Sequence, residues 1–157
     1  MILAEGDQAL RAPSVPRIRW LEGWARGVRA GMVDRQTDAD TLRPHLPRGT
    51  RFAEAEQVHG SSVAFIDRTL EAGTPVPGCD ALLTRMAGLA LLVRTADCVP
   101  LFMCDPIRQA IGIAHVGWRG LMAQLPIRLV AAFRHAVNSR PADLRVALGP
   151  AIRACCY

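Results

Sequence analysis

Four short apolar runs dominate the hydrophobic pattern in the second half of the chain. They cover residues 81–84, 89–94, 99–104 and 110–115. Continuous apolar runs of this length are typical of strands that are covered on both faces. Residues 105–108 between the last two runs form a tight turn, with Pro106 in its second position. Because so short a link can join only antiparallel neighbours, the pattern predicts a mixed sheet.

One helix is predicted after these strands. Its apolar positions share one face at helical spacing, and they are Leu125, Leu129, Ala132, Phe133, Ala136 and Val137. The spacing predicts a helix over residues 121–137, with Pro126 either kinking it or marking its effective start. Residues 138–141 contain Asn, Ser and Pro and should end it.

The remaining elements are shorter. Strands are predicted over residues 50–58, 62–66 and 145–148, with a loop at 73–78 that contains two prolines. The first fifty residues are punctuated by Pro and Gly, and the pattern there allows short strands at 17–21 and 25–30 and one helical turn at 38–42. Strands and helices along a chain of 157 residues predict a single α/β (α+β) domain with a mixed β-sheet and flanking helices.

Charge changes this picture little. The net charge is +5, and every one of the nineteen basic residues is arginine. The arginines are scattered and form no run of the kind that binds nucleic acid, so no nucleic-acid partner is expected. Genomic base composition is the simpler explanation of the arginine excess.

Cysteine usage and hydropathy indicate the compartment. The chain has five cysteines, an odd number, in apolar or near-terminal settings that do not form a disulfide framework. No charged segment followed by a long apolar stretch begins at Met1, and no apolar run approaches the length of a membrane span. A cytoplasmic protein without a membrane partner is therefore expected, with Cys155 and Cys156 reduced and packed.

Three residues form a candidate metal site. His59 follows a predicted strand, Cys98 precedes one and His115 ends one, so the three residues could converge on one edge of the sheet. Their wide separation in the sequence is unlike that of a zinc finger. Three protein ligands leave a fourth position for water, which is typical of catalytic rather than structural zinc.

The neighbours of these residues extend the hypothesis. Asp97 precedes the thiol and is a candidate for proton transfer or for orienting an imidazole. Arg119 opens the segment after His115 and is a candidate anion-binding residue. Gly117 would let the backbone approach a ligand closely.

Each residue also has a structural interpretation. Cys98 alone would be read as a small buried apolar residue, and a single histidine as a hydrogen-bonded structural residue. Asp97 could cap a turn. Trp118 is expected in the core rather than as a substrate platform. His45 and His135 have no supporting context and are expected on the surface.

Several motifs together resemble one protein family. They are Gln57-Val58-His59-Gly60, Cys79-Asp80-Ala81-Leu82-Leu83-Thr84, Thr95-Ala96-Asp97-Cys98-Val99-Pro100, Ala114-His115-Val116-Gly117-Trp118-Arg119-Gly120, Gly149-Pro150-Ala151-Ile152 and Cys155-Cys156-Tyr157. This ordered set resembles the bacterial polyphenol oxidase or laccase-domain family, also called the purine nucleoside phosphorylase or peptidoglycan editing factor family. The resemblance covers about residues 50–157.

The resemblance implies a fold, a metal and a reaction. The fold would be cysteine-hydrolase-like, with mixed sheets. The metal would be zinc, held by His59, Cys98 and His115. The activity would be phosphorolysis of adenosine, inosine and methylthioadenosine, together with adenosine deamination. Purine nucleoside and phosphate would then be the partners, and the oligomeric state is left open.

The candidate site residues all lie in these motifs. Cys98, His115 and Asp97 are the candidate catalytic residues, and Arg119, Gln57 and Gly117 are the candidate substrate-binding residues. The family also has an N-terminal Ser-Leu-Asn-type segment and an Asn-Arg pair, and residues 22–50 show neither. Because family members continue beyond the Cys-Cys-Tyr motif, the domain over residues 1–157 is expected to be incomplete at its C-terminus.

Three other functions compete with a zinc enzyme. Cys98 could be a metal-free nucleophile with His115 or His59 as its base, as in a cysteine hydrolase. A non-catalytic binding module is the second alternative. Copper oxidation of phenols, which the laccase label implies, is the weakest, because a multicopper cluster needs more imidazoles than the four histidines present.

Overall fold

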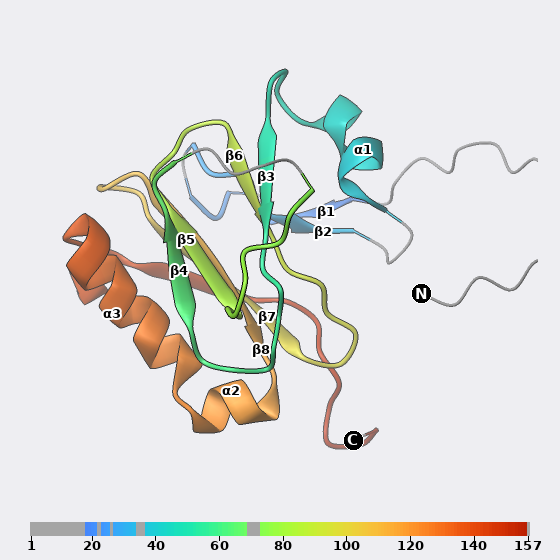
Figure 1. Cartoon of the computed structure of the whole chain (residues 1–157), viewed down its shortest axis with the longest axis vertical. Helices are drawn as coiled ribbons and strands as arrows, with labels where there is room; N and C mark the ends of the chain where they lie inside the picture. The colour runs from blue at the N-terminus through green and yellow to red at the C-terminus, as the bar shows by residue number, and fades with distance from the viewer. Residues whose placement is uncertain (1–17, 22, 26, 34–36, 69–72, 157) are drawn as a thin grey trace, which may run out of the picture.

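A five-stranded mixed sheet organises the structure, a computed structural model that describes residues 18–21, 23–25, 27–33, 37–68 and 73–156. Its strand order is β4-β5-β8-β7-β9. The bounds are Val63–Ile66 for β4, Ala81–Thr84 for β5, Val99–Asp105 for β7, Ala110–Val116 for β8 and Arg145–Leu148 for β9. Only β4 and β5 are parallel, and the other pairs are antiparallel. The predicted mixed sheet and α/β class are therefore confirmed (Figure 1).

Two smaller sheets lie beside the main one. Strands β3 (Arg51–Glu54) and β6 (Leu89–Leu92) pair in parallel, and β1 (Arg19–Trp20) pairs antiparallel with β2 (Gly31–Met32). Strand β6 had been expected among strands covered on both faces, but three of its four residues are only half-buried. The reason is that it belongs to a two-stranded sheet at the side of the main core.

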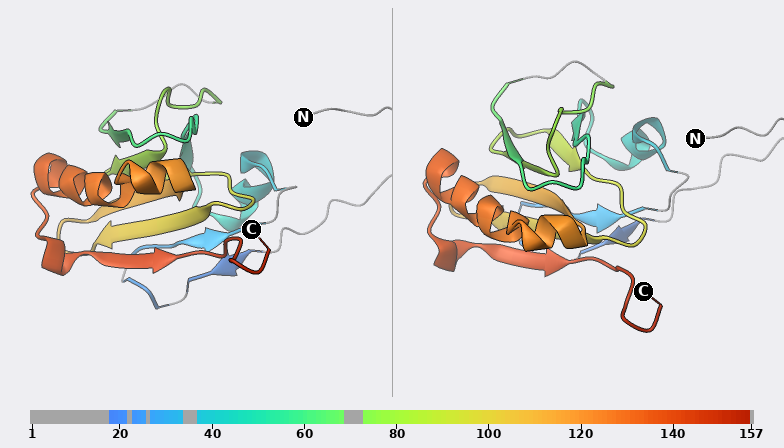
Figure 2. Two further views of the ribbon diagram at one scale, coloured as in Figure 1. Left: turned by 90° about the horizontal axis from the view of Figure 1, so that it is seen from below. Right: turned by 60° about the horizontal axis from the view of Figure 1, so that its bottom comes forward.

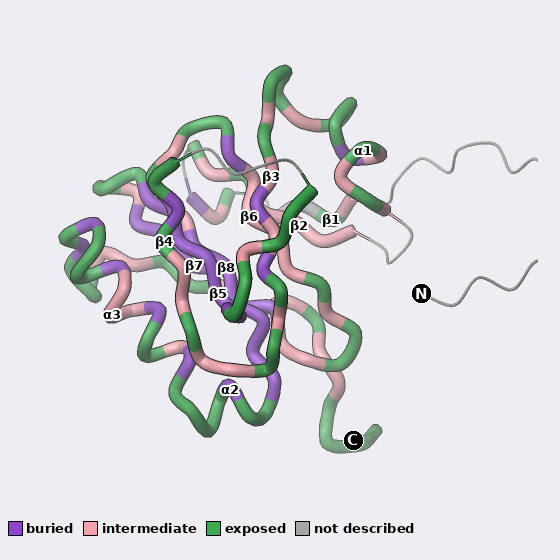
Figure 3. The backbone as a smooth tube through the Cα atoms, in the orientation of Figure 1, coloured by how far each residue is buried: buried purple, intermediate pink, exposed green. Residues whose placement is uncertain are grey.

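Alternate residues of the central strands enter two separate cores. Ala81 and Leu83 of β5 pack with Leu125, Leu129 and Phe133 of helix α3 (Leu125–Val137). Leu82 faces the other way, into a cluster that includes residues of β3 and β6. Each fully buried large apolar side chain contributes about 1.5–3 kcal/mol. Figure 3 shows this burial concentrated in β5, β7 and β8.

The predicted helix is divided into two. Helix α2 spans Trp118–Met122, and α3 begins at Leu125 and ends at Val137 as predicted. Gln124 has a left-handed backbone with a φ of 62°, and Pro126 lies in the first turn of α3. Proline suits a first helical turn, because the N–H that it lacks has no partner there. Pro126 therefore marks the start of the long helix rather than a kink.

The N-terminal predictions are partly wrong. Residues 25 and 27–30 form no strand, because Gly23 and Gly27 take left-handed backbone angles that turn the chain between β1 and β2. Asp38 caps the short helix α1 (Ala39–Leu42) by accepting from the Thr41 N–H at 2.8 Å, as expected for the helical turn. A 3-10 turn follows at Arg43–His45, and another at Pro141–Asp143 precedes β9. Arg17, at the start of the first expected strand, and Arg26, within the second, lie outside the described residues.

Strand register determines which residues meet at the lower end of the sheet in Figure 1. Val99 pairs with Val116, so the start of β7 and the end of β8 lie at the same edge. Ala81 pairs with Ala114 in the adjacent antiparallel pair. The loop between β3 and β4 passes this end of the sheet beside α2. Strand β9 is the outer strand of the sheet next to β7 (Figure 2).

Candidate metal centre

The structure brings the three predicted ligands together. One ligand atom from each of His59, Cys98 and His115 lies within 4.8 Å of the others. The two imidazole rings meet edge to face, with centroids 4.8 Å apart and an interplanar angle of 86°. His115 is buried, Cys98 is half-buried and His59 is exposed, so the cluster opens to solvent on the His59 side.

The Asp80 side chain contacts two of these residues, His59 and His115. Its side chain is fully buried and accepts from the backbone N–H of His59 at 3.0 Å and of Gly60 at 2.7 Å. Its Oδ1 also lies 3.0 Å from Nδ1 of His115. Burial by itself raises the pKa of Asp80, but the hydrogen bonds from His115, Gly60 and His59 outweigh it, and the pKa lies below its ordinary value. Asp80 is therefore an ionised acceptor at neutral pH.

Asp80 is the functional residue that the sequence reasoning missed. Asp97 had been the candidate for orienting an imidazole, because it is adjacent to Cys98. In the structure Asp97 is exposed, and its backbone carbonyl accepts from the Ile152 N–H at 3.0 Å. The available signal was Asp80 at the start of an apolar strand, within one of the motifs that carry the family resemblance. A proton-transfer role for Asp97 stays a prediction.

Glycines make the close packing of this centre possible. A Cβ on Gly117 would lie 3.1 Å from Sγ of Cys98 and 3.4 Å from Cδ2 of His59. A Cβ on Gly120 would lie 2.8 Å from the Gly60 carbonyl oxygen, so α2 rests directly on the loop that holds His59. Gly117, predicted to make room for a substrate, thus makes room for the ligand cluster itself.

The loop that carries His59 is held in an unusual conformation. Gln57 and His59 both have left-handed backbones, with φ values of 63° and 59°. The Gln57 side chain accepts from the Arg94 N–H and donates to the Arg94 carbonyl oxygen, each at 2.6 Å. These bonds engage both ends of the Gln57 amide with the backbone. The substrate contact predicted for Gln57 is untested.

The environment of Cys98 keeps its thiol protonated. Partial burial, followed by the negative charges of Asp97 and Asp80, raises the pKa of Cys98 above its ordinary value. A cysteine nucleophile needs the opposite, a lowered pKa from a nearby positive charge. A bound cation would supply that charge and make the sulfur a thiolate ligand.

Arg119 and Trp118 lie at the start of α2. Both are exposed, and the Arg119 guanidinium carbon lies 5.3 Å from the centroid of the Trp118 ring. Trp118 is 62% exposed, so its expected place in the core is wrong. The chain turns into α2 directly after Gly117, which leaves the indole outside the sheet's two cores.

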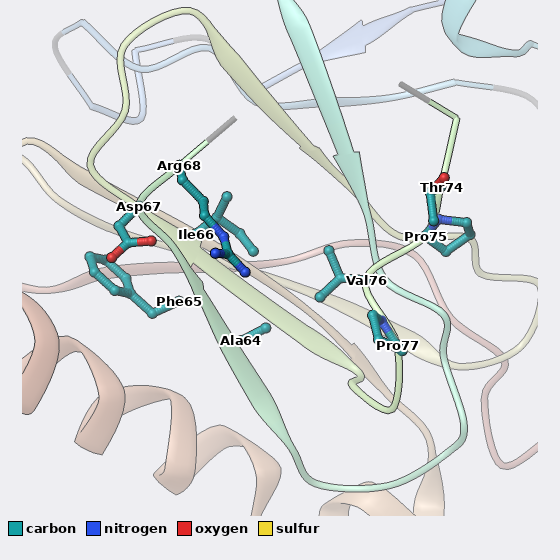
Figure 4. Close-up of a pocket in the computed structure, with 9 residues that line it drawn as sticks. All are labelled: Ala64, Phe65, Ile66, Asp67, Arg68, Thr74, Pro75, Val76 and Pro77. Atoms are coloured by element: carbon teal, nitrogen blue, oxygen red, sulfur yellow. The ribbon is translucent and has the colours of Figure 1, made fainter. Parts of the chain in front are cut away.

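Other candidate features lie away from the cluster. A surface hollow between β4 and residues 74–77 is lined by none of the three ligands (Figure 4). Cys155 and Cys156 are free cysteines with their sulfurs 3.2 Å apart. Both are exposed, so the expectation that they are packed is wrong. No helix among the described residues has the length and apolarity to cross a membrane.

Comparison with known proteins identifies the family. Residues 32–157 match the family described as multi-copper polyphenol oxidoreductase laccase. The chain belongs to this family. The resemblance seen in the motifs is thereby confirmed.

The relatives of this laccase-family chain carry one name. It is 36% identical over 113 residues to "Purine nucleoside phosphorylase YlmD" of Geobacillus stearothermophilus, covering 68% of this chain and 41% of the relative. It is 32% identical over 166 residues to "Purine nucleoside phosphorylase" of Deinococcus radiodurans, covering 95% and 62%. The chain spans about two fifths of the length of the first of these relatives.

A crystal structure supports the fold. The "hypothetical protein YfiH" of Bacillus licheniformis matches with a TM-score of 0.65 and 32% identity, over 75% of this chain and 46% of that one. The laccase-family fold of the chain is thus shown by both sequence and structure.

Proposed function

We propose that the protein catalyses phosphorolysis of purine nucleosides at a zinc centre formed by His59, Cys98 and His115. The observation that carries this proposal is the convergence of the three ligand atoms within 4.8 Å. The names of the relatives support the reaction class.

The donor set suits zinc. Zinc binds Cys sulfur and His nitrogen at about 2.0–2.3 Å, which places tetrahedral donors about 3.3–3.8 Å apart. The three donor atoms lie within 4.8 Å of one another. The longest of the three distances needs to shorten by about 1 Å to reach the spacing of tetrahedral donors. Zinc also prefers imidazoles whose other nitrogen is held by a carboxylate, as Asp80 holds His115. Copper is the weaker candidate, because His45 and His135 are not part of the cluster.

The protein's own groups have separate tasks in this proposal. Asp80 orients His115, and the exposed position of His59 leaves the centre open to a substrate. Arg119, stacked on Trp118, is the candidate group for phosphate. The chemistry that zinc supplies when bound is Lewis-acid polarisation of an oxygen and a lowered pKa for a water.

The finer assignments belong to the same proposal. Adenosine, inosine and methylthioadenosine are the proposed nucleosides, and deamination of adenosine is a second reaction that an open metal position would serve. Asp97, which lies close enough for its charge to raise the pKa of Cys98, is the candidate for proton transfer. A cytoplasmic location is part of the proposal as well.

Metal analysis and an adenosine assay test the proposal together. Protein purified without chelator should contain about one zinc per chain and should release adenine from adenosine only when phosphate is present. Cys98→Ala should lose both the zinc and the turnover, whereas His135→Ala, on the exposed side of α3, should keep both. Full turnover without bound metal would instead favour the cysteine-hydrolase mechanism, and zinc without turnover would favour a binding module.

A further inference from the structure

Asp80 contacts both histidines of the cluster. His59 comes from the loop after β3, and His115 comes from β8, so no local contact within one element places them together. The Asp80 carboxylate joins them, because its Oδ1 lies 3.0 Å from the His59 N–H nitrogen and 3.0 Å from Nδ1 of His115. Its Oδ2 accepts from Gly60 at 2.7 Å.

All three neighbours of this carboxylate must donate. The backbone N–H groups of His59 and Gly60 can only donate, and an ionised carboxylate can only accept. The proton of a neutral His115 ring is therefore on Nδ1, which leaves the lone pair on Nε2 free to bind a metal. One buried group thus determines both the backbone path at His59 and the tautomer of His115.

We propose that Asp80 is a positioning residue that prepares both histidine ligands of the cluster before any metal binds. The left-handed backbone at His59, which a non-glycine residue adopts only when its surroundings require it, is held by this contact. The link between Asp80 and turnover rests on the proposed function, whereas its link to metal binding does not.

The substitution Asp80→Asn separates this proposal from simple packing. Asn has the same shape, but one of its two terminal atoms is an NH₂ donor. If that donor replaces Oδ2, it faces the Gly60 N–H. If it replaces Oδ1, it faces the His59 N–H and the His115 ring, and it can satisfy the ring only by moving the ring proton to Nε2. The first arrangement opposes two donors in the loop that carries His59, and the second disturbs the contacts to both histidines.

Zinc affinity of the whole chain provides the first test. We expect Asp80→Asn to weaken zinc binding by about 10–100-fold, the range typical of carboxylates that hydrogen-bond to a metal-binding histidine. Asp67→Asn, an exposed carboxylate at the end of β4, is the matched control and should bind zinc as the wild type does. Unchanged affinity in a folded Asp80→Asn protein, or a loss that follows Asp97→Asn instead, would overturn the proposal.

Nitrogen NMR of the histidine rings provides a test that needs neither turnover nor metal. In metal-free wild-type protein, the neutral form of the His115 ring should carry its proton on Nδ1 and not on Nε2. This measurement stands even if Asp80→Asn fails to fold. A wild-type His115 with its proton on Nε2 would contradict the proposal.

The two proposals can fail separately. Weakened zinc binding in Asp80→Asn together with a wild type that never phosphorolyses adenosine would leave the role of Asp80 intact and refute the proposed reaction. Normal zinc affinity in Asp80→Asn together with phosphate-dependent turnover in the wild type would do the reverse.

Discussion

At the scale of single residues, the candidate metal centre depends on glycines that leave room for the ligands as well as on the ligands themselves. Gly117 lies where a methyl group would meet the Cys98 and His59 side chains, and Gly120 lies where one would meet the backbone of Gly60. The candidate metal centre, which four separate segments form, therefore has little free volume between its parts. Substitutions that add atoms here should weaken metal binding, as substitutions that remove a ligand do.

Gly117→Ala tests this crowding. Its new methyl group would lie 3.1 Å from Sγ of Cys98, so the sulfur must move or the backbone must shift. Overpacking of this kind costs about 1–3 kcal/mol, and we expect zinc affinity to fall by about tenfold or more. Isothermal titration with zinc measures the effect. Gly88→Ala is the control, since it strains a left-handed turn away from the centre and should leave the affinity unchanged.

Arg119→Ala tests the proposed phosphate group. If Arg119 binds phosphate, its loss should reduce phosphorolysis by about 10–100-fold, the value of one charge-assisted hydrogen bond. Deamination of adenosine, which uses no phosphate, should change little. The exposed Arg134 on α3 provides the control in Arg134→Ala. An equal loss in both reactions would argue that Arg119 has a general structural role.

At the scale of elements, one contact fixes how α3 lies on the sheet. A Cβ on Gly112 of β8 would lie 2.8 Å from Cε2 of Phe133 and 3.2 Å from the Leu82 carbonyl oxygen. Helix and strand approach so closely here only because the strand residue has no side chain. Gly112 thus controls the distance between α3 and the main sheet.

Gly112→Ala should therefore destabilise the protein by about 1–3 kcal/mol through overpacking. Denaturant unfolding followed by circular dichroism measures the change. Adding Phe133→Leu removes the ring that the methyl group meets, so the double variant should be more stable than the sum of the single effects predicts. Strict additivity would show that the two residues do not compete for the same space.

The elements themselves were largely predictable, and the register between them was not. Apolar runs gave the central strands, and the spacing of Leu125, Leu129 and Phe133 gave the long helix. Asp97 was preferred over Asp80 because sequence shows only neighbours along the chain. The pairing of Ala81 with Ala114 places Asp80 opposite His115, where the His115 N–H also donates to the Asp80 carbonyl oxygen at 2.8 Å. Such pairings depend on the whole sheet.

At the scale of the whole molecule, acid should destabilise the fold through Asp105, the last residue of β7. Burial by itself raises the pKa of Asp105, but the nearby Ser139 hydroxyl and the hydrogen bonds from the backbone N–H groups of Arg108 and Ile107 outweigh it, and the net shift is downward. The Ile107 and Arg108 amides donate to its Oδ1 at 2.8 and 2.9 Å. A carboxylate with a lowered folded-state pKa stabilises the fold above its unfolded pKa of about 3.9, and this contribution is lost as pH falls through the folded value.

Asp105→Asn should consequently flatten the acid limb of the stability curve. The amide oxygen can still accept from the same backbone groups, but it does not titrate. Unfolding free energies measured between neutral pH and pH 3 should fall less steeply for the variant than for the wild type. The net charge of +5 makes both proteins less stable in acid through self-repulsion, so the difference between them is the informative quantity. Parallel curves would show that Asp105 contributes nothing to acid sensitivity.

The dispersal of the ligands along the chain also has a consequence for biosynthesis. The Gln57 side chain makes two hydrogen bonds to the backbone of Arg94. These bonds connect the segment before His59 to the segment before Cys98. His115 is the last of the three proposed ligands to leave the ribosome, and Asp80, just before β5, can contact its ring only after β8 has paired with β5. The nascent chain therefore holds no complete set of the three ligands until β8 has been synthesised.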